Sequence, residues 1–301
     1  MRKNLLAPGH SACAGCGESL AIRLVLNAAG EDIIVANATG CSEIFTSNYP
    51  LSAWEVPWIH SLFENTAAVA SGIEAALKVS GRKNEAKVIA QGGDGGMADI
   101  GLQALSGMWE RWHNVLSICY DNEGYMNTGI QRSGLTPLDA KTTTSPPGKS
   151  SWGNYRPKKN LPRIAAAHGI PYVAVTTVAY PRDIEEKVQR AIKIEGPKYI
   201  QIYSPCPLGW RSEPSQTIEI ARLAVETGIY PVYEMIDGKI TSVKKFPKLK
   251  PVEEFLKLQG RFSHLFTKKG GDEEIKKIQK IADDNINQFG MALEEGEELR
   301  E

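Results

Sequence analysis

The chain has 301 residues, of which 42% are apolar and 23% are charged, and these values are ordinary for a globular protein. This length allows one large α/β domain or two smaller ones and is too great for a small disulfide-stabilised scaffold. Lysine and arginine together number 35, as do aspartate and glutamate, so the formal net charge is zero. A nucleic-acid or membrane-surface partner, which a strongly basic chain would attract, is therefore not expected.

Short β-branched segments alternate with helical patterns along most of the chain. This alternation predicts an α/β fold, a doubly wound and mostly parallel sheet covered by helices. The predicted strands are 33–36, 87–90, 115–120, 171–175 and 199–203, and the predicted helices are 64–79, 97–112 and 183–194. The longest apolar stretch, 170–179, is too short to cross a bilayer, and the first residues lack a signal-peptide pattern. We therefore expect a cytoplasmic protein with reduced thiols.

Two segments depart from this alternation. Residues 133–163 are rich in Ser, Thr, Pro, Gly and Lys and lack periodicity, so they predict a long loop that is functional or covered by a partner. After Gly238 the chain becomes rich in Lys and Glu with scattered apolar residues, and 268–301 resembles a solvated helix with a frayed end. We expect a main domain over 1–240 and a helical extension over 241–301 that contacts another subunit.

A glycine-rich turn follows the strand predicted at 87–90 and precedes a helix. Free backbone N–H groups and the helix dipole face the same point there, so the turn predicts an anion site. Asp94 lies in the turn, and its carboxylate would repel a phosphate unless a divalent cation sat between them. Asn122 follows the strand predicted at 115–120, and neighbouring parallel strands share a crevice at their carboxyl ends. A carboxylate and an amide oxygen would suit Mg²⁺.

Five cysteines are present. Cys13 and Cys16 form a Cys-x-x-Cys pair, Cys41 follows a predicted strand, and so does Cys206. Four thiolates could bind Zn²⁺ or a 4Fe–4S cluster, and the spacing does not choose between them, although Cys-x-x-Cys alone favours zinc. Cys119 lies inside an apolar strand and is expected to be a buried small hydrophobe.

The Gly-Asp-Gly turn with an asparagine 28 positions after its aspartate resembles the diphosphate-binding motif of thiamine diphosphate enzymes. The resemblance implies that the Asp94 and Asn122 side chains and the Gly124 carbonyl hold Mg²⁺. It also implies diphosphate contacts from Gly93, Gly95, Gly96 and Thr128.

Nearly the whole chain resembles the β subunit of the 2-oxoacid:ferredoxin oxidoreductases, particularly the pyruvate-specific ones. The segments that carry the resemblance are CAGCGE from Cys13, ATGC from Ala38, WEVPWIHSLFENTAAVASG from Trp54, GGDGGMADIGLQALSGM from Gly92, DNEGYMNTG from Asp121, SPCP from Ser204 and KPVEEFLKLQGRF from Lys250. The resemblance implies that Cys13, Cys16, Cys41 and Cys206 hold a 4Fe–4S cluster. Such a cluster can take electrons from thiamine chemistry, whereas zinc is redox-silent.

The resemblance also implies roles for several single residues. Glu18 would lie near the aminopyrimidine, although a helix-capping carboxylate is the alternative. Thr39, Gly40 and Cys41 would contact the cofactor. Ile44 would lie beneath it, with a core position as the alternative, and Asn127 would reach a substrate oxygen, with turn capping as the alternative. His60 is assigned no catalytic role.

The activity implied is reversible oxidative decarboxylation of pyruvate with coenzyme A to acetyl-CoA and CO₂, with electrons passing to ferredoxin. The implied partners are an α subunit with the pyrimidine-binding domain, and γ/δ or fused ferredoxin-like subunits. Ile130 follows Asn-Thr-Gly where pyruvate-type subunits carry Asn, so another small 2-oxoacid, or oxalate oxidised to CO₂ without coenzyme A, stays open. A zinc-stabilised, non-redox α/β binding protein and a non-redox thiamine decarboxylase are the alternatives from other classes.

Overall fold

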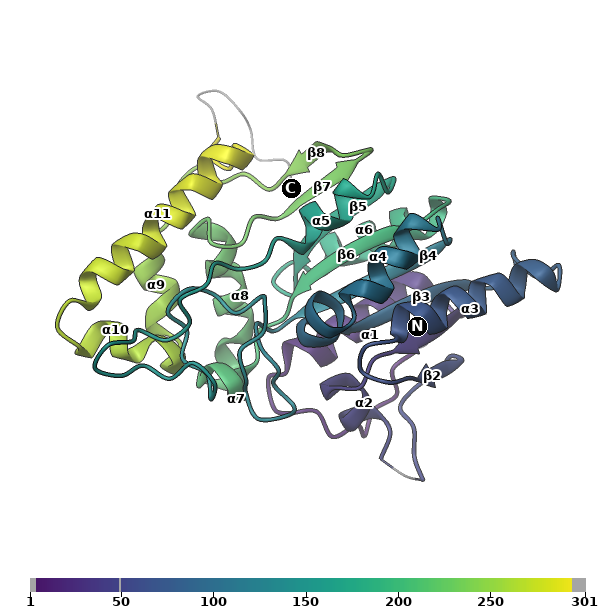
Figure 1. Ribbon diagram of the computed structural model, residues 1–301, viewed down its shortest axis with the longest axis horizontal. Coiled ribbons are helices and arrows are strands. Elements are labelled where there is room, and N and C mark those ends of the chain that lie inside the picture. Colours follow the sequence, from purple (N-terminus) through teal and green to yellow (C-terminus); the bar gives the residue numbers. More distant parts are fainter. Residues whose placement is uncertain (1–3, 49, 294–301) are drawn as a thin grey trace.

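The computed structural model describes residues 4–48 and 50–293. Within these ranges, one sheet of eight strands has the order β2-β1-β3-β4-β6-β5-β7-β8 (Figure 1). The first six strands of that order are parallel, and β7 and β8 are antiparallel to their neighbours. The strands are β1 Ile33–Asn37, β2 Trp58–His60, β3 Lys87–Gly93, β4 Val115–Asp121, β5 Tyr172–Thr177, β6 Lys198–Tyr203, β7 Tyr233–Ile236 and β8 Lys239–Val243.

The helices lie mainly on the two faces of this sheet. They are α1 Gly17–Ala29, α2 Cys41–Thr46, α3 Thr66–Val79, α4 Leu102–Glu110, α5 Leu161–Ala167, α6 Pro181–Lys193, α7 Pro207–Trp210, α8 Thr217–Glu226, α9 Val252–Lys257, α10 Ser263–Thr267 and α11 Gly271–Phe289. Short turns of other types are the π-helix η1 Gly95–Ile100 and the 3₁₀ helices η2 Pro214–Gln216 and η3 Gly260–Phe262. Among the described residues, none of the helices combines the length and apolar character that crossing a membrane requires.

The predicted fold class is confirmed, and the five predicted strands are present as β1, β3, β4, β5 and β6. The single helix predicted over 97–112 is wrong, because the structure has the π-helix η1 followed by α4. The antiparallel pair β7–β8 was not predicted, and β8 crosses the expected boundary at residue 240, so the sheet extends to Val243.

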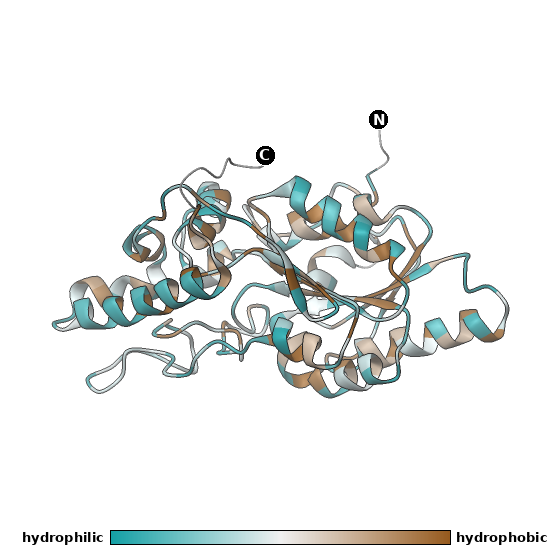
Figure 2. Cartoon of the chain, turned by 90° about the horizontal axis from the view of Figure 1, so that it is seen from above, coloured by the Kyte–Doolittle hydropathy of each residue, from teal (hydrophilic) through white to brown (hydrophobic). Residues whose placement is uncertain are grey.

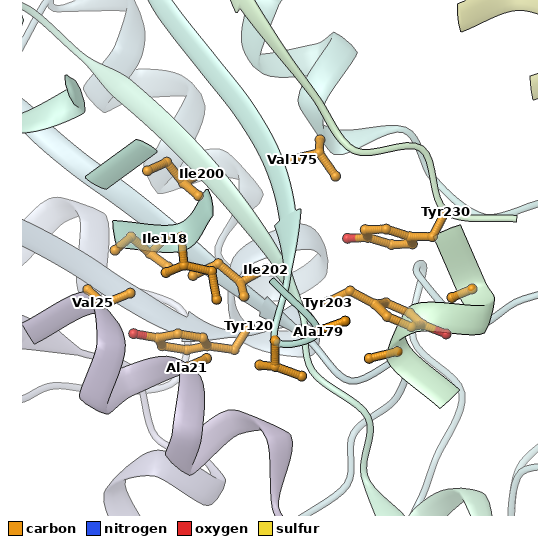
Figure 3. Packing of buried hydrophobic residues seen from close by; sticks show 14 of the residues in the cluster. Ala21, Val25, Ile118, Tyr120, Val175, Ala179, Ile200, Ile202, Tyr203 and Tyr230 are labelled. Atoms are coloured by element: carbon orange, nitrogen blue, oxygen red, sulfur yellow. The ribbon is translucent and has the colours of Figure 1, made fainter. Parts of the chain in front are cut away.

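Two large clusters of buried apolar side chains lie on the two faces of the sheet. Figure 2 shows mostly hydrophobic strands with helices on both sides of them. Along β4 the side chains alternate: Ile118 and Tyr120 face the layer that contains α1, whereas Cys119 faces the layer that contains α3 and α4. Figure 3 shows Ala21 and Val25 of α1 packed beside Ile118 and Tyr120. Cys119 is fully buried, as predicted from its apolar strand.

The predicted long loop is present up to α5, and it packs against the C-terminal extension of the same chain. The backbone N–H of Lys141 donates to the Arg261 carbonyl over 3.0 Å, and the His264 imidazole Nε2 lies 2.6 Å from the Trp152 carbonyl oxygen. Phe255 and Leu256 of the extension are buried within the chain. Apolar composition of this segment therefore does not by itself require another subunit, and subunit contact by residues 241–301 stays a prediction.

The strand order gathers one set of loops at one edge. Strands β1, β3, β4 and β6 are parallel neighbours, so their carboxyl ends lie together. The segments that follow them contain Cys41, Asp94, Asn122 and Cys206 respectively. Residues separated by more than one hundred positions are thereby brought to one crevice, the usual ligand position in an open α/β sheet.

Asp139 links the long loop to α11 and makes the stability of this contact depend on pH. It is buried and has a left-handed backbone with φ of 60°. Burial, and then the Glu274 carboxylate, raise its pKa to about 7 against an opposing effect of Lys277. The pKa of Asp139 is higher in the folded than in the unfolded protein, so ionising Asp139 lowers the free energy of unfolding. This destabilisation is absent below about pH 4, grows as the pH rises to 7 and is constant above pH 7.

We predict that Asp139→Asn stabilises the protein at pH 8 by about 1 kcal/mol or more, after allowing for partial hydration, with a melting temperature about 2–4 °C higher. Asn tolerates the left-handed backbone and can donate to Glu274. At pH 4 the gain should vanish. Glu273→Gln, which removes an exposed carboxylate on the same helix, is the matched control and should change neither melting temperature. Thermal denaturation at both pH values tests this, and an equal gain at pH 4 and pH 8 would contradict it.

Candidate functional site

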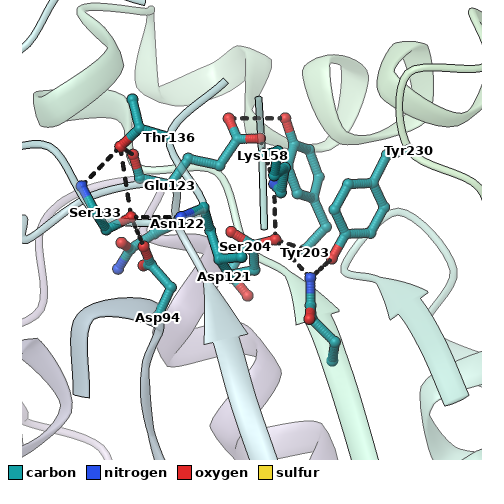
Figure 4. Close-up of polar contacts among 12 residues, drawn as sticks. Asp94, Asp121, Asn122, Glu123, Ser133, Thr136, Lys158, Tyr203, Ser204 and Tyr230 are labelled. Atoms are coloured by element: carbon teal, nitrogen blue, oxygen red, sulfur yellow. Dashed lines mark hydrogen bonds and ion pairs between the residues drawn. The ribbon is translucent and has the colours of Figure 1, made fainter. Parts of the chain in front are cut away.

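Asp94 directly follows β3 and is completely buried. Figure 4 shows it beside Ser133. Asp94 Oδ2 accepts a hydrogen bond from the Ser133 hydroxyl, which the long loop supplies. In the part of the chain that the structure describes, its Oδ1 is buried without a hydrogen-bond partner. The π-helix η1 begins at the next residue, and irregular helical turns of this type are frequent at functional sites.

Asn122 directly follows β4, and β4 is the neighbour of β3, the strand that Asp94 follows. Its Nδ2 donates to Glu18 Oε2 over 3.2 Å, and its backbone carbonyl accepts from Trp210 Nε1 over 2.8 Å. Glu18 Oε1 and Asp121 Oδ1 are buried without a hydrogen-bond partner in the described residues, and so are Asn122 Oδ1 and Asp94 Oδ1, which follow adjacent strands. Buried polar atoms in native proteins are almost always satisfied, so this pair of oxygens requires a ligand, and a hard cation fits both.

The electrostatic environment of Asp94 also fits a cation. Burial, and then the Asp121 charge, raise the pKa of Asp94 well above its ordinary value, while Ser133, Lys158 and the Gly124 backbone N–H act in the opposite direction. A divalent ion beside the carboxylate would supply the charge that otherwise only a proton supplies.

The glycines of the turn differ in the space around them. A Cβ on Gly95 would lie 2.7 Å from the Tyr125 ring, so a larger residue there would force that ring to move. A Cβ on Gly93 would meet nothing within 4 Å, and Gly93 does not need a left-handed backbone. Gly93 therefore borders open space, which a phosphate group can approach closely.

A buried ionic network involves the two residues on either side of Asn122, Asp121 and Glu123. The Lys158 ammonium lies 2.8 Å from Asp121 Oδ2 and 2.6 Å from Glu123 Oε1, and Arg261 Nη2 lies 2.5 Å from Glu123 Oε2. Burial works to raise the pKa of Glu123, but the Lys158 and Arg261 charges outweigh it and hold that pKa below its ordinary value. Glu123 is therefore held as a carboxylate between two cations, whereas burial raises the pKa of Asp121 against the opposing charge of Lys158.

Three of the predicted sulfur ligands are fixed by helix starts. Cys16 and Cys206 are the N-caps of α1 and α7, and their Sγ atoms accept from the Ser19 and Gly209 backbone N–H groups over 3.5 and 3.4 Å. Cys41 is the first residue of α2. Cys13, in the preceding loop, is exposed.

The four thiols are close enough to influence one another. Burial, then Glu18, then Cys206 raise the pKa of Cys16 to about 12. The pKa of Cys41 is raised by burial, Glu18 and each of the other three cysteines, and that of Cys206 is raised to about 11 by burial, Glu18 and Cys13. Such thiols become ligands when a metal takes the place of their protons. Among the described residues, no three His, Cys, Asp or Glu side chains are arranged to hold one metal ion.

Glu18 joins the two halves of the site. Its carboxylate is buried, is hydrogen-bonded to Asn122 and acts electrostatically on three of the cysteines. These contacts go beyond the helix-capping role considered for Glu18. Burial raises its pKa to about 7 against the opposing effect of Asn122.

The remaining predicted residues lie around this crevice. Thr39 Oγ1 lies 2.8 Å from His60 Nε2, and a Cβ on Gly40 would meet nothing within 4 Å. Ile44 is 48% exposed, which excludes the core position considered for it. Asn127 and Thr128 are exposed on the loop after β4, where the Thr128 hydroxyl donates to Gln131 Oε1 over 2.7 Å.

Sequence reasoning missed four residues of this region: Ser133, Lys158, Trp210 and Arg261. The acidic residues Asp121 and Glu123 on either side of Asn122 were a usable indication, because two carboxylates at a strand end need buried cations. The positions of these cations in the loop and the extension could not be read from local patterns.

Comparison with known proteins agrees with this geometry. Residues 38–202 match the family model described as thiamine pyrophosphate enzyme, C-terminal TPP binding domain. A solved structure of 2-oxoglutarate:ferredoxin oxidoreductase from Magnetococcus marinus shares the fold, with a TM-score of 0.57 and 22% identity over 71% of this chain and 77% of that chain. The fold and the site therefore define a thiamine diphosphate-binding domain.

Two relatives of known family show which thiamine diphosphate-binding family the chain belongs to. The chain is 57% identical over 289 residues to pyruvate synthase subunit PorB of Methanosarcina barkeri, covering 96% of this chain and 98% of the relative. It is 51% identical over 280 residues to ketoisovalerate oxidoreductase subunit VorB of Pyrococcus abyssi, covering 90% and 88%. The chain belongs to the β-subunit family of the 2-oxoacid:ferredoxin oxidoreductases, which includes the pyruvate synthase subunits PorB, and is thus a subunit of an oxidoreductase.

The open space beside Gly93 yields a test. We predict that Gly93→Ala leaves the melting temperature of the cofactor-free enzyme unchanged but weakens thiamine diphosphate binding roughly tenfold or more, because the methyl group fills the space next to the turn. Gly148→Ala is the matched control, since a Cβ there also meets nothing within 4 Å. Gly148 lies in the part of the long loop that pairs with Ser151 and Lys268 rather than with the turn. Calorimetric titration measures the affinity, and equal affinities for the two variants would show that the diphosphate lies elsewhere.

Proposed function

We propose that this chain is the subunit that binds thiamine diphosphate, Mg²⁺ and a 4Fe–4S cluster in an enzyme that oxidatively decarboxylates pyruvate with coenzyme A to acetyl-CoA and CO₂. The reaction is reversible and its electrons pass to ferredoxin. One observation carries the proposal: the unpartnered oxygens of Asp94 and Asn122 lie in the same crevice as four mutually close cysteines, with Glu18 between them.

In this proposal Asp94 Oδ1, Asn122 Oδ1 and the Gly124 carbonyl hold Mg²⁺. Gly93, which borders open space, would contact the diphosphate together with Gly95, Gly96 and Thr128. Bound thiamine diphosphate supplies the nucleophilic carbon that attacks the 2-oxoacid carbonyl and accepts the electrons left by decarboxylation. Glu18, Thr39, Gly40 and Ile44 line the path of the cofactor, and Asn127 approaches a substrate oxygen.

The proposal favours a cluster over zinc because thiamine chemistry releases electrons that a cluster can accept, whereas zinc is redox-silent. A single Zn²⁺ bonds each sulfur at about 2.3 Å, which requires all four sulfurs to converge on one point. In a 4Fe–4S cluster each cysteine binds a different iron, so the sulfurs surround a larger volume. Cys13, Cys16, Cys41 and Cys206 influence one another electrostatically, which either arrangement would allow, so metal analysis must decide between them.

The pyruvate assignment is supported by relatives, but identity alone leaves the substrate open. The relatives named for pyruvate and for ketoisovalerate are 57% and 51% identical to this chain. Ile130, next to the substrate loop, has a left-handed backbone with φ of 63°, which is unusual for a β-branched side chain. Another small 2-oxoacid or oxalate is therefore the alternative that the substrate assay must separate.

The proposal includes partners and a location. An α subunit with the pyrimidine-binding domain completes the cofactor site, ferredoxin-like subunits extend the electron path, and the complex is cytoplasmic. Exposed apolar side chains on α2 and around β2, namely Ile44, Ile59 and Leu62, lie on elements that flank the crevice and offer a surface to the α subunit.

The substrate is tested on the intact complex, purified through a tag on this chain. We expect ferredoxin reduction with pyruvate plus coenzyme A, and little with 2-ketoisovalerate plus coenzyme A or with oxalate alone. Preference for either of these substrates would replace pyruvate by the corresponding alternative. Absence of ferredoxin reduction with every 2-oxoacid would overturn the proposal.

The cluster ligands are tested by single substitutions. We predict that Cys41→Ser and Cys206→Ser lower the iron content of the complex by about four atoms per copy of this chain, with a matching partial loss of iron–sulfur absorbance, and abolish ferredoxin reduction. Thiamine diphosphate should stay bound, since the Mg²⁺ groups are untouched. Cys119→Ser, in the buried strand, is the matched control and should keep the absorbance. Iron and zinc analysis of the same samples accompanies the spectra, and a colourless wild-type protein with one zinc would favour the structural alternative.

A further inference from the structure

Glu123 separates the two proposed magnesium ligands, Asn122 and Gly124, and does not itself point at them. It is 2% exposed and has a left-handed backbone with φ of 65°. A non-glycine residue keeps this conformation only when its surroundings hold it. The shape of the turn that offers the Asn122 side chain and the Gly124 carbonyl therefore depends on what holds Glu123.

Two cations from distant parts of the chain hold the Glu123 carboxylate. Lys158, from the end of the long loop, binds Oε1 at 2.6 Å, and Arg261, from the C-terminal extension, binds Oε2 at 2.5 Å. The Glu123 carbonyl accepts from the Thr136 hydroxyl over 2.8 Å. Glu123 is thus fixed at both carboxylate oxygens and at its carbonyl.

Arg261 also acts on the other side of the turn. Its guanidinium lies 3.9 Å from the centre of the Trp210 ring, and Trp210 Nε1 donates to the Asn122 carbonyl. One side chain therefore supports both Glu123 and the tryptophan that binds the backbone of Asn122. A planar guanidinium can bind a carboxylate and stack on an indole together, which an ammonium cannot do as well.

Arg261 is itself held firmly, although it comes from a segment more than one hundred residues away. It is 3% exposed, its carbonyl accepts from Lys141, and its Nε donates to Gln259 Oε1 over 3.0 Å. The preceding Gly260 donates to the Arg211 carbonyl, and a Cβ on Gly260 would lie 2.7 Å from Arg211 Cβ. The backbone is therefore close-packed where Arg261 enters the core.

We propose that Arg261 and Lys158 are positioning residues for the magnesium–diphosphate turn, and that the C-terminal extension sets the affinity for the cofactor through this contact. The inference rests on the proposed function, because it needs Mg²⁺ at Asn122 and Gly124. Neither cation touches the reacting atoms. Both act through Glu123, and Arg261 acts also through Trp210.

The test is the affinity for Mg²⁺–thiamine diphosphate of the cofactor-depleted complex, purified through a tag on this chain. Arg261→Met should raise the dissociation constant roughly 10- to 100-fold, as loss of a supporting residue around a metal site does. At saturating cofactor the kcat should recover largely, so the defect appears in binding. Arg190→Met is the control: it breaks the 2.6 Å ion pair to Glu234, near the opposite edge of the sheet. It should lower the melting temperature yet leave the dissociation constant within about twofold.

Arg261→Lys keeps the charge and guards against a variant that fails to fold. It should fold and bind the cofactor more weakly than the wild type and more tightly than Arg261→Met. A wild-type dissociation constant in Arg261→Lys, or in a folded Arg261→Met, would overturn the inference. If the wild-type complex itself did not bind Mg²⁺–thiamine diphosphate, the proposed function would have failed, and that result is distinct from normal binding in the variants.

Discussion

The constraint on which the rest of this structure depends is the meeting of four parallel strand ends at one edge. Strands β1, β3, β4 and β6 are neighbours, so the chain can deliver Cys41, Asp94, Asn122 and Cys206 to one crevice from four different segments. A ligand position of this kind is general to open α/β sheets. In this chain the edge carries two chemistries side by side, oxygen donors on β3 and β4 and sulfur donors after β1 and β6, with Cys13 and Cys16 arriving from the start of α1.

Charge compensation makes this edge possible. Asp94, Asp121, Glu123 and Glu18 are all buried there, and burying carboxylates without partners is strongly unfavourable. Lys158 and Arg261 balance Asp121 and Glu123, and they come from the long loop and the extension. The left-handed turn at Glu123 stores roughly 1 kcal/mol or more of backbone strain, which these contacts offset. The long loop and the C-terminal extension thus stabilise the centre of the site.

The sequence alone predicted those features of the fold that depend on residues adjacent along the chain. Periodicity predicted five of the six parallel strands and missed the short β2, and the apolar neighbours of Cys119 predicted its burial. These predictions succeeded because they depend on adjacent residues. Sequence patterns failed where distant residues decide. The helix predicted at 97–112 is interrupted because η1 adapts the turn after Asp94, and the pairing of Glu123 with Arg261 links positions 138 residues apart. The hairpin of β7 and β8 is indicated by the dipeptide Asp237-Gly238, which is common in two-residue hairpin turns.

The central claim is that one crevice binds a magnesium–diphosphate group and a 4Fe–4S cluster next to each other. An experimental structure of the complex loaded with Mg²⁺ and thiamine diphosphate, with anomalous data at the iron edge, tests it most directly. The account predicts Mg²⁺ about 2.0–2.1 Å from oxygens of Asp94, Asn122 and Gly124, and a four-iron anomalous signal bonded to Cys13, Cys16, Cys41 and Cys206. A diphosphate bound away from Asp94, or a single metal ion among the cysteines, would contradict it.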